Sequence, residues 1–185
     1  MRYQMFASVA FAIAAFMLQS TDAKAQNFSA NFSGFEEIGA LNNETGAIFS
    51  PGQGRLALVL NTNAQTLNFQ LSYSGLSAPV TQSHIHFGKE HVPGGIMVFF
   101  CSNLPNPPPG TQVCPSPPGG TVIGTIMGSN VVGPTAQHVT PGDFNALAQA
   151  ILSNTAYGNI HTTAFPSGEI RGQIVPGTLN QNPPP

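Results

Sequence analysis

The chain has 185 residues, of which only five are Lys or Arg and seven are Asp or Glu, and its formal net charge is −2. A chain of this length fits one domain with a real hydrophobic core. So few basic residues argue against nucleic acid and against an anionic membrane surface as partners, because both are bound by clustered Lys and Arg.

The first 25 residues are typical of a secretory signal peptide. Arg2 gives a positive start, residues 5–18 are almost wholly apolar, and Ala23-Lys24-Ala25 supplies a small-x-small cleavage pattern. The apolar run is short for a membrane span, and no later stretch offers one. We therefore expect an exported protein, periplasmic or extracellular, whose mature chain starts near Gln26 with three Lys or Arg against six Asp or Glu, a net charge of −3.

Short segments of alternating polarity follow, and they predict strands rather than helices. Phe28, Ala30 and Phe32 alternate with polar neighbours, which is the period of a half-buried strand. Further strand-like segments, bounded by turn residues, are 54–61, 66–75, 83–88, 95–102, 121–128, 157–165 and 168–175. Short strands at regular spacing with Gly and Pro between them predict a β-sandwich or barrel.

One segment near the C-terminal third predicts a short amphipathic helix. Thr140 is the expected N-cap, with Pro141 in the first turn and Asp143 three residues after the cap. Apolar residues then recur at helical spacing: Phe144, Leu147, Ala148, Ile151 and Leu152. Residues 177–185 have nothing to bury and are expected to be disordered, which leaves residues 26–176 as the domain.

The chain has two cysteines, Cys101 and Cys114, separated by a Pro-rich loop. In an oxidising compartment, an even pair is expected to form a disulfide. The alternative is a pair of thiolates that binds a soft metal such as Cu(I).

Three histidines have the strand parity of a metal site. His84 and His86 are two residues apart, so they share one face of their strand, opposite Ile85 and Phe87. His161 likewise opposes Ile160. If the aliphatic residues face the core, His84, His86 and His161 lie together on a polar face and can bind one ion, with Glu169 orienting a ring N–H from behind.

The alternative is that each histidine is an ordinary polar strand residue that makes cross-strand hydrogen bonds. His91 and His138 stand in loops beside Gly or Pro and are interpreted as solvated. Glu169 and Arg171 also fit a simple ion pair on the last hairpin.

The order of these segments resembles the CHRD domain, first named from chordin. The most specific pieces are His84-Ile85-His86 with Gly88, and His161-Thr162 followed by residues 168–173, "GEIRGQ". The resemblance implies an all-β, antiparallel Greek-key sandwich, immunoglobulin-like or superoxide-dismutase-like, and its motifs include His84, His86, His161, Glu169 and Arg171. The Cys101–Cys114 loop and the segment 156–159, "AYGN", depart from the family pattern.

Residues 75–88 are also similar to the His-x-His strand of copper/zinc superoxide dismutases, where two imidazoles bind copper. That similarity stops there, and the mature charge offers no positive guide field for superoxide. Three functions therefore stay open. They are a metal-binding module, with copper favoured and zinc as the alternative; a structural, adhesive or protein-interaction sandwich without metal; and a copper-dependent redox enzyme, which is the least favoured.

Overall fold

The computed structural model describes residues 25–38, 46–116 and 119–178. The predicted signal peptide, apart from its last residue, and most of the predicted tail lie outside these ranges. No helix in the described part of the chain is long and apolar enough to span a bilayer. The strands are β1 (Gln26–Ser33), β2 (Gln53–Asn61), β3 (Thr66–Ser74), β4 (Val80–Phe87), β5 (Gly95–Ser102), β6 (Gly120–Ile126), β7 (Ala156–Thr162), β8 (Ile170–Gln173) and β9 (Val175–Pro176). The helices are α1 (Phe144–Leu152) and the short 3₁₀ turns η1 (Gly34–Glu36), η2 (Gly128–Asn130) and η3 (Thr135–Gln137).

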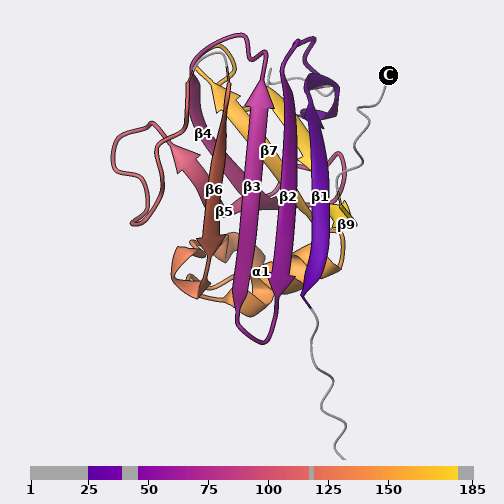
Figure 1. The fold of residues 1–185 in the computed structure, drawn as a ribbon, viewed down its shortest axis with the longest axis vertical. Coiled ribbons are helices and arrows are strands. Elements are labelled where there is room, and N and C mark those ends of the chain that lie inside the picture. The colour runs from indigo at the N-terminus through magenta and orange to yellow at the C-terminus, as the bar shows by residue number, and fades with distance from the viewer. Residues whose placement is uncertain (1–24, 39–45, 117–118, 179–185) are drawn as a thin grey trace, which may run out of the picture.

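The strands form one curled antiparallel sheet in the order β5-β4-β7-β8-β1-β2-β3-β6, with β9 joined to β1. In Figure 1, β6, β3, β2 and β1 form one layer, β4, β5 and β7 cross behind it, and α1 lies at one end. Gln112 links the two ends of the sheet, because its backbone carbonyl accepts from Ser102 N–H at 2.8 Å and its side chain donates to the Ile123 carbonyl at 3.0 Å. The fold is therefore all-β and nearly a closed barrel. This confirms the all-β fold class that was predicted from the sequence.

In the front layer, buried and more exposed residues alternate along each strand, as expected for a sheet with one buried face. In β2, Leu56, Leu58 and Leu60 are buried, and in β3, Leu67 and Leu71 are buried, with more exposed residues between them. These side chains fill the space between the two layers because alternate strand residues point to opposite faces.

The rear layer differs, because both of its faces are covered. Every residue of β7 is buried, and so are Ser83, His84, Ile85 and His86 of β4. The histidine face is thus a second interior, and not the solvent-facing side that a half-buried strand implies.

Helix α1 begins later than predicted. Asp143 is its N-cap, and the Asp143 side chain accepts a hydrogen bond from Ala146 N–H at 3.0 Å. The prediction of Thr140 as the cap was wrong: Thr140 instead accepts from Asp143 N–H through its backbone carbonyl, at 3.1 Å, in the turn before the helix. Asp143 is the stronger cap because its carboxylate reaches the free N–H groups of the first turn.

Cys101 and Cys114 lie at disulfide distance, with Sγ atoms 2.11 Å apart and Cα atoms 5.0 Å apart. Both residues are buried, so the pair fastens the Pro-rich loop to the end of β5. This pairing was expected from the sequence, and it leaves neither thiol as a metal ligand.

Candidate metal centre

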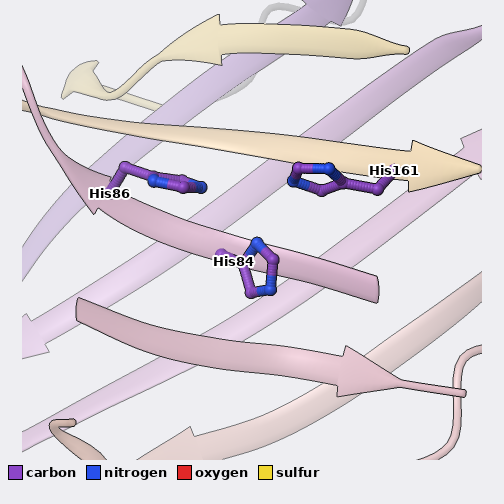
Figure 2. Close-up of side chains that lie close together, drawn as sticks. All are labelled: His84, His86 and His161. Atoms are coloured by element: carbon purple, nitrogen blue, oxygen red, sulfur yellow. The ribbon is translucent and has the colours of Figure 1, made fainter. Parts of the chain in front are cut away.

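The pairing of β4 with β7 brings the three histidines together. His84 lies directly opposite Asn159, and Gln82 lies opposite His161. Side chains two residues apart share a face, so His84, His86 and His161 are neighbours on one side of the strand pair. Figure 2 shows the three rings turned toward one another from the two strands. The convergence expected from parity is present.

The spacing of the rings suits a single ion. Ring centroids are 5.3 Å apart for His84 and His86, 5.0 Å for His84 and His161, and 6.4 Å for His86 and His161. One ring nitrogen from each lies within 4.8 Å of the other two. Atoms so spaced share a point within about 2.8 Å of each, whereas a metal–imidazole bond is about 2.0–2.1 Å long, so the rings would close in by less than ~1 Å.

All three rings are closed off from solvent. The exposed fractions are 0% for His84, 8% for His86 and 7% for His161. The Phe99 ring, opposite His84 on β5, lies edge-on to it with centroids 4.4 Å apart. Loop carbonyls border the other two rings.

Those carbonyls fix two tautomers. The Gly94 carbonyl lies 2.8 Å from His86 Nδ1, and the Pro166 carbonyl lies 2.8 Å from His161 Nδ1. A carbonyl only accepts, so Nδ1 carries the proton in each ring, and in the neutral ring Nε2 then holds a lone pair. This is the arrangement in which a backbone carbonyl orients a metal-binding imidazole.

Burial keeps the three rings neutral. It lowers the pKa of His84 to about 2, helped by repulsion from His161 and His86, and it lowers the pKa of His86 to about 4. Burial also lowers the pKa of His161, although the hydrogen bond to Pro166 opposes this change. Neutral rings are the form that binds a metal.

Unsatisfied buried atoms concentrate on this same face. Most buried polar atoms in proteins have a hydrogen-bond partner, so those without one call for an explanation. In the described part of the chain, buried side-chain atoms without such a partner are His84 Nδ1 and Nε2, His161 Nε2, Glu37 Oε2, Arg171 Nη1 and Gln173 Oε1. The strand register places His84, His161, Arg171 and Gln173 on one face of β4, β7 and β8.

Asn159 stands between the histidines and the rest of this face. Its Oδ1 lies 3.0 Å from His86 Nε2, and its partner across β8 is Arg171. Because His86 Nε2 holds a lone pair, it pairs with Asn159 only when the amide is turned to present its N–H. Asn159 is therefore an adjustable partner that can release this lone pair to an ion.

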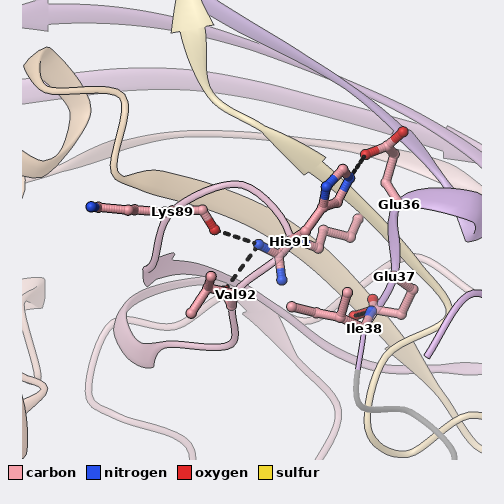
Figure 3. A network of polar contacts seen from close by, with 7 residues as sticks. Glu36, Glu37, Ile38, Lys89, His91 and Val92 are labelled. Carbon is pink, nitrogen blue, oxygen red and sulfur yellow. Dashed lines mark hydrogen bonds and ion pairs between the residues drawn. The ribbon is translucent and has the colours of Figure 1, made fainter. Parts of the chain in front are cut away.

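Glu37 is a buried carboxyl at the edge of the site, and no periodic pattern in the sequence predicted it. It is 2% exposed, and its Oε1 accepts from Ile38 N–H at 3.0 Å. Burial raises the pKa of Glu37 to about 7, against the opposing effects of Ile38, Arg171 and Asn159. Figure 3 shows Glu37 and Ile38 beside the loop that contains Lys89, His91 and Val92.

Arg171 holds that loop in place. Its guanidinium donates to the carbonyls of Lys89 and Val92, each at 3.1 Å. The guanidinium carbon lies 3.4 Å from the centroid of the Tyr157 ring, and that ring stacks on His86. Arg171 thus positions the loop that supplies the Gly94 carbonyl, and it is 1% exposed.

Glu169 does not contact the three imidazoles. Its carboxylate accepts from Ser50 Oγ at 2.6 Å, Ser77 N–H at 2.9 Å and Thr162 Oγ1 at 2.7 Å. Thr162 follows His161 directly and points to the opposite face of β7. Glu169 and Arg171 also form no ion pair, since the ion pair in the described ranges joins His91 and Glu36. In this geometry Glu169 anchors loops on the other side of the strand.

The remaining candidates are exposed. Glu36, Glu90 and His91 lie close enough to hold an ion, but Glu36 is only half-buried and the other two are exposed. Glu36 and His91 already pair at 3.0 Å (Figure 3). His138 is exposed in a loop, as expected. A surface groove lined by Ser29, Gln53 and Arg55, among others, contains none of the three buried histidines.

The fold and these residues define an antiparallel β-module with a buried histidine cluster. The CHRD domain model matches residues 28–174, so the chain belongs to the CHRD domain family. No curated protein and no solved structure matches the chain significantly. The match includes both histidine segments within one domain.

Proposed function

We propose that this CHRD domain is an exported metal-binding module in which His84, His86 and His161 hold one copper ion, with zinc as the alternative. The observation that carries the proposal is the set of three buried, neutral imidazoles whose nitrogens lie within 4.8 Å of one another. His84 has two ring nitrogens without a hydrogen-bond partner and His161 has one. Burying such groups unpaired costs free energy, and a bound ion would offset that cost.

The surroundings support a site that is shaped before the ion arrives. The Gly94 and Pro166 carbonyls hold two rings in the ligand tautomer. The Tyr157 stack and the Phe99 edge contact limit the rotation of His86 and His84. Preorganised ligands lose less conformational entropy on binding.

Export is part of the proposal. The basic start, apolar run and small-x-small pattern of residues 1–25 support it. The Cys101–Cys114 pair is compatible with an oxidising compartment.

Isothermal titration of the mature, metal-stripped chain with Cu(II) and Zn(II) tests the binding. Two variants remove a ligand while keeping much of its volume: His84→Phe, which keeps a ring beside Phe99, and His161→Gln. We expect one ion per wild-type chain and an affinity loss in each variant larger than the roughly 10–100-fold that outer partners contribute.

His138→Asn is the matched control, because His138 is exposed and has φ of 61°, a conformation that Asn tolerates. This control should bind as the wild type does. If none of Cu(II), Zn(II) and Cu(I) binds, or if binding survives in both ligand variants, the histidines serve only to stabilise the sheet and the metal-binding function is excluded.

A further inference from the structure

We infer that the three-histidine site selects a monovalent copper ion, Cu(I), over divalent cations. The inference rests on the proposed metal-binding function and specifies the charge and coordination of the ion. It follows from three properties of the site: the neutrality of its ligands, the positive charge behind it, and its closure to water.

The ligands bring no negative charge. The buried group close enough to hold an ion consists of three imidazoles, with no carboxylate or thiolate among them. The cost of moving an ion out of water grows with the square of its charge, so a buried dication needs far more compensation than a monocation. Neutral donors supply little of that compensation.

A buried positive charge lies behind His86. Arg171 is held by the Lys89 and Val92 carbonyls and lies over Tyr157, whose ring stacks on His86 with planes 1° apart. Arg171 and His86 both pack on the Tyr157 ring, so the guanidinium lies close to the His86 imidazole and repels a cation bound there. This repulsion is twice as large for a dication.

The buried acids do not reverse this balance. The Glu169 carboxylate is engaged by Ser50, Ser77 and Thr162, away from the imidazoles. Glu37 Oε1 accepts from Ile38 N–H, and burial raises the pKa of Glu37 to about 7, so its carboxyl is mostly neutral below that pH. Glu36 pairs with His91 at the surface, and Glu90 is exposed, so solvent screens both.

The closure of the site favours low coordination. Zinc in proteins is almost always four-coordinate, with a protein side chain or water in the fourth position. Here the described residues offer three ligands, and none of the rings is more than 8% exposed. Cu(I) is commonly stable with two or three donors, so it needs no fourth ligand here.

The test compares affinities of the mature chain for Cu(I) and Zn(II). Cu(I) is titrated anaerobically, with ascorbate as reductant, against the chromophoric chelator bicinchoninate; Zn(II) is titrated against a zinc-binding dye at the same pH. We expect Cu(I) to bind roughly 100-fold or more tightly than Zn(II), and His161→Gln to lose both ions. Zn(II) affinity equal to or above that for Cu(I) would overturn the inference while leaving the metal-binding function intact.

A different outcome separates the two claims. If neither ion binds, or if both bind equally well to wild type and to His161→Gln, the proposed function fails and this inference fails with it.

A second variant tests the electrostatic argument. Arg171→Met should raise the affinity for Zn(II) relative to Cu(I) and lower the ratio of Cu(I) to Zn(II) affinity several-fold. Arg55→Met on β2 should leave this ratio unchanged. An unchanged ratio in a folded Arg171→Met protein would contradict the role of this charge. Should that variant not fold, the wild-type comparison decides alone.

Discussion

His86 and Tyr157 lie directly opposite each other on β4 and β7, and their rings stack with planes 1° apart and centroids 4.8 Å apart. The Tyr157 hydroxyl also accepts from Gly94 N–H at 3.1 Å, while the Gly94 carbonyl binds His86 Nδ1. One aromatic residue therefore positions the ring of a proposed ligand both directly and through the loop.

Replacing the Tyr157 ring is expected to lower the affinity of the site for copper. Tyr157→Leu removes the stack, worth about 0.5–1.5 kcal/mol, and should weaken copper binding by up to roughly 10-fold. The matched variant Tyr157→Phe keeps the ring and loses only the hydroxyl, so its affinity should stay within a few-fold of wild type. Titration of both variants with copper measures these affinities. Equal losses of affinity in the two variants would show that the stack does not position His86.

Acid should destabilise the metal-free protein through its histidines. Burial lowers their pKa values in the folded state below the ordinary value of 6.5, to about 2 for His84 and about 4 for His86. A lowered pKa gives stability that is present above pH 6.5 and is lost as the pH falls toward the folded-state value. Each histidine should cost about 1.4 kcal/mol per pH unit in this window, so urea unfolding at pH 7 and pH 5 should show a steep loss that His84→Phe reduces. A wild-type slope no steeper than that of the variant would contradict this assignment.

Glu37 should have the opposite pH dependence. Its pKa is raised from 4.5 to about 7, so its contribution to stability is full below pH 4.5 and is lost as the pH rises through 7. Glu37→Gln cannot ionise, so relative to wild type it should gain on the order of 3 kcal/mol between pH 4.5 and pH 8. Chemical unfolding of the two proteins across this range measures the difference. A difference that does not change with pH would mean that Glu37 is solvated.

Helix α1 offers a test of the local fold. Asp143→Ala removes the carboxylate that accepts from Ala146 N–H, and should cost about 1 kcal/mol of stability. Thr140→Ala should cost less, because the Thr140 side chain makes no cap contact in the described structure. Denaturant midpoints compare the two, and a larger loss for Thr140→Ala would restore the cap predicted from sequence.

Local sequence pattern was enough to predict the strands and the convergence of the histidines. Alternation marks β2 and β3, and an apolar run marks β5, each within a residue or so, and two-residue parity places His84, His86 and His161 on one face. Both signals depend only on near neighbours in the chain, which is why they transfer directly to the structure.

Long-range contacts account for the remaining features. Pairing of β4 with β7 and of β1 with β8 makes one curled sheet, and no local pattern encodes those partners. The histidine face is buried because Phe99 of β5 and the loops that carry Gly94 and Pro166 cover its rings, and neither loop has a periodic pattern. Glu37 was missed for the same reason, and the surroundings of Glu169 depend on loops distant in sequence, at Ser50 and Ser77.

The most direct test of the central claim is X-ray absorption at the copper edge on the mature protein after copper loading and desalting. We expect one copper per chain with three imidazole nitrogens at about 2.0 Å, and loss of imidazole scattering in His161→Gln. A desalted protein that retains no copper, or a first shell with fewer than two imidazoles, would contradict it.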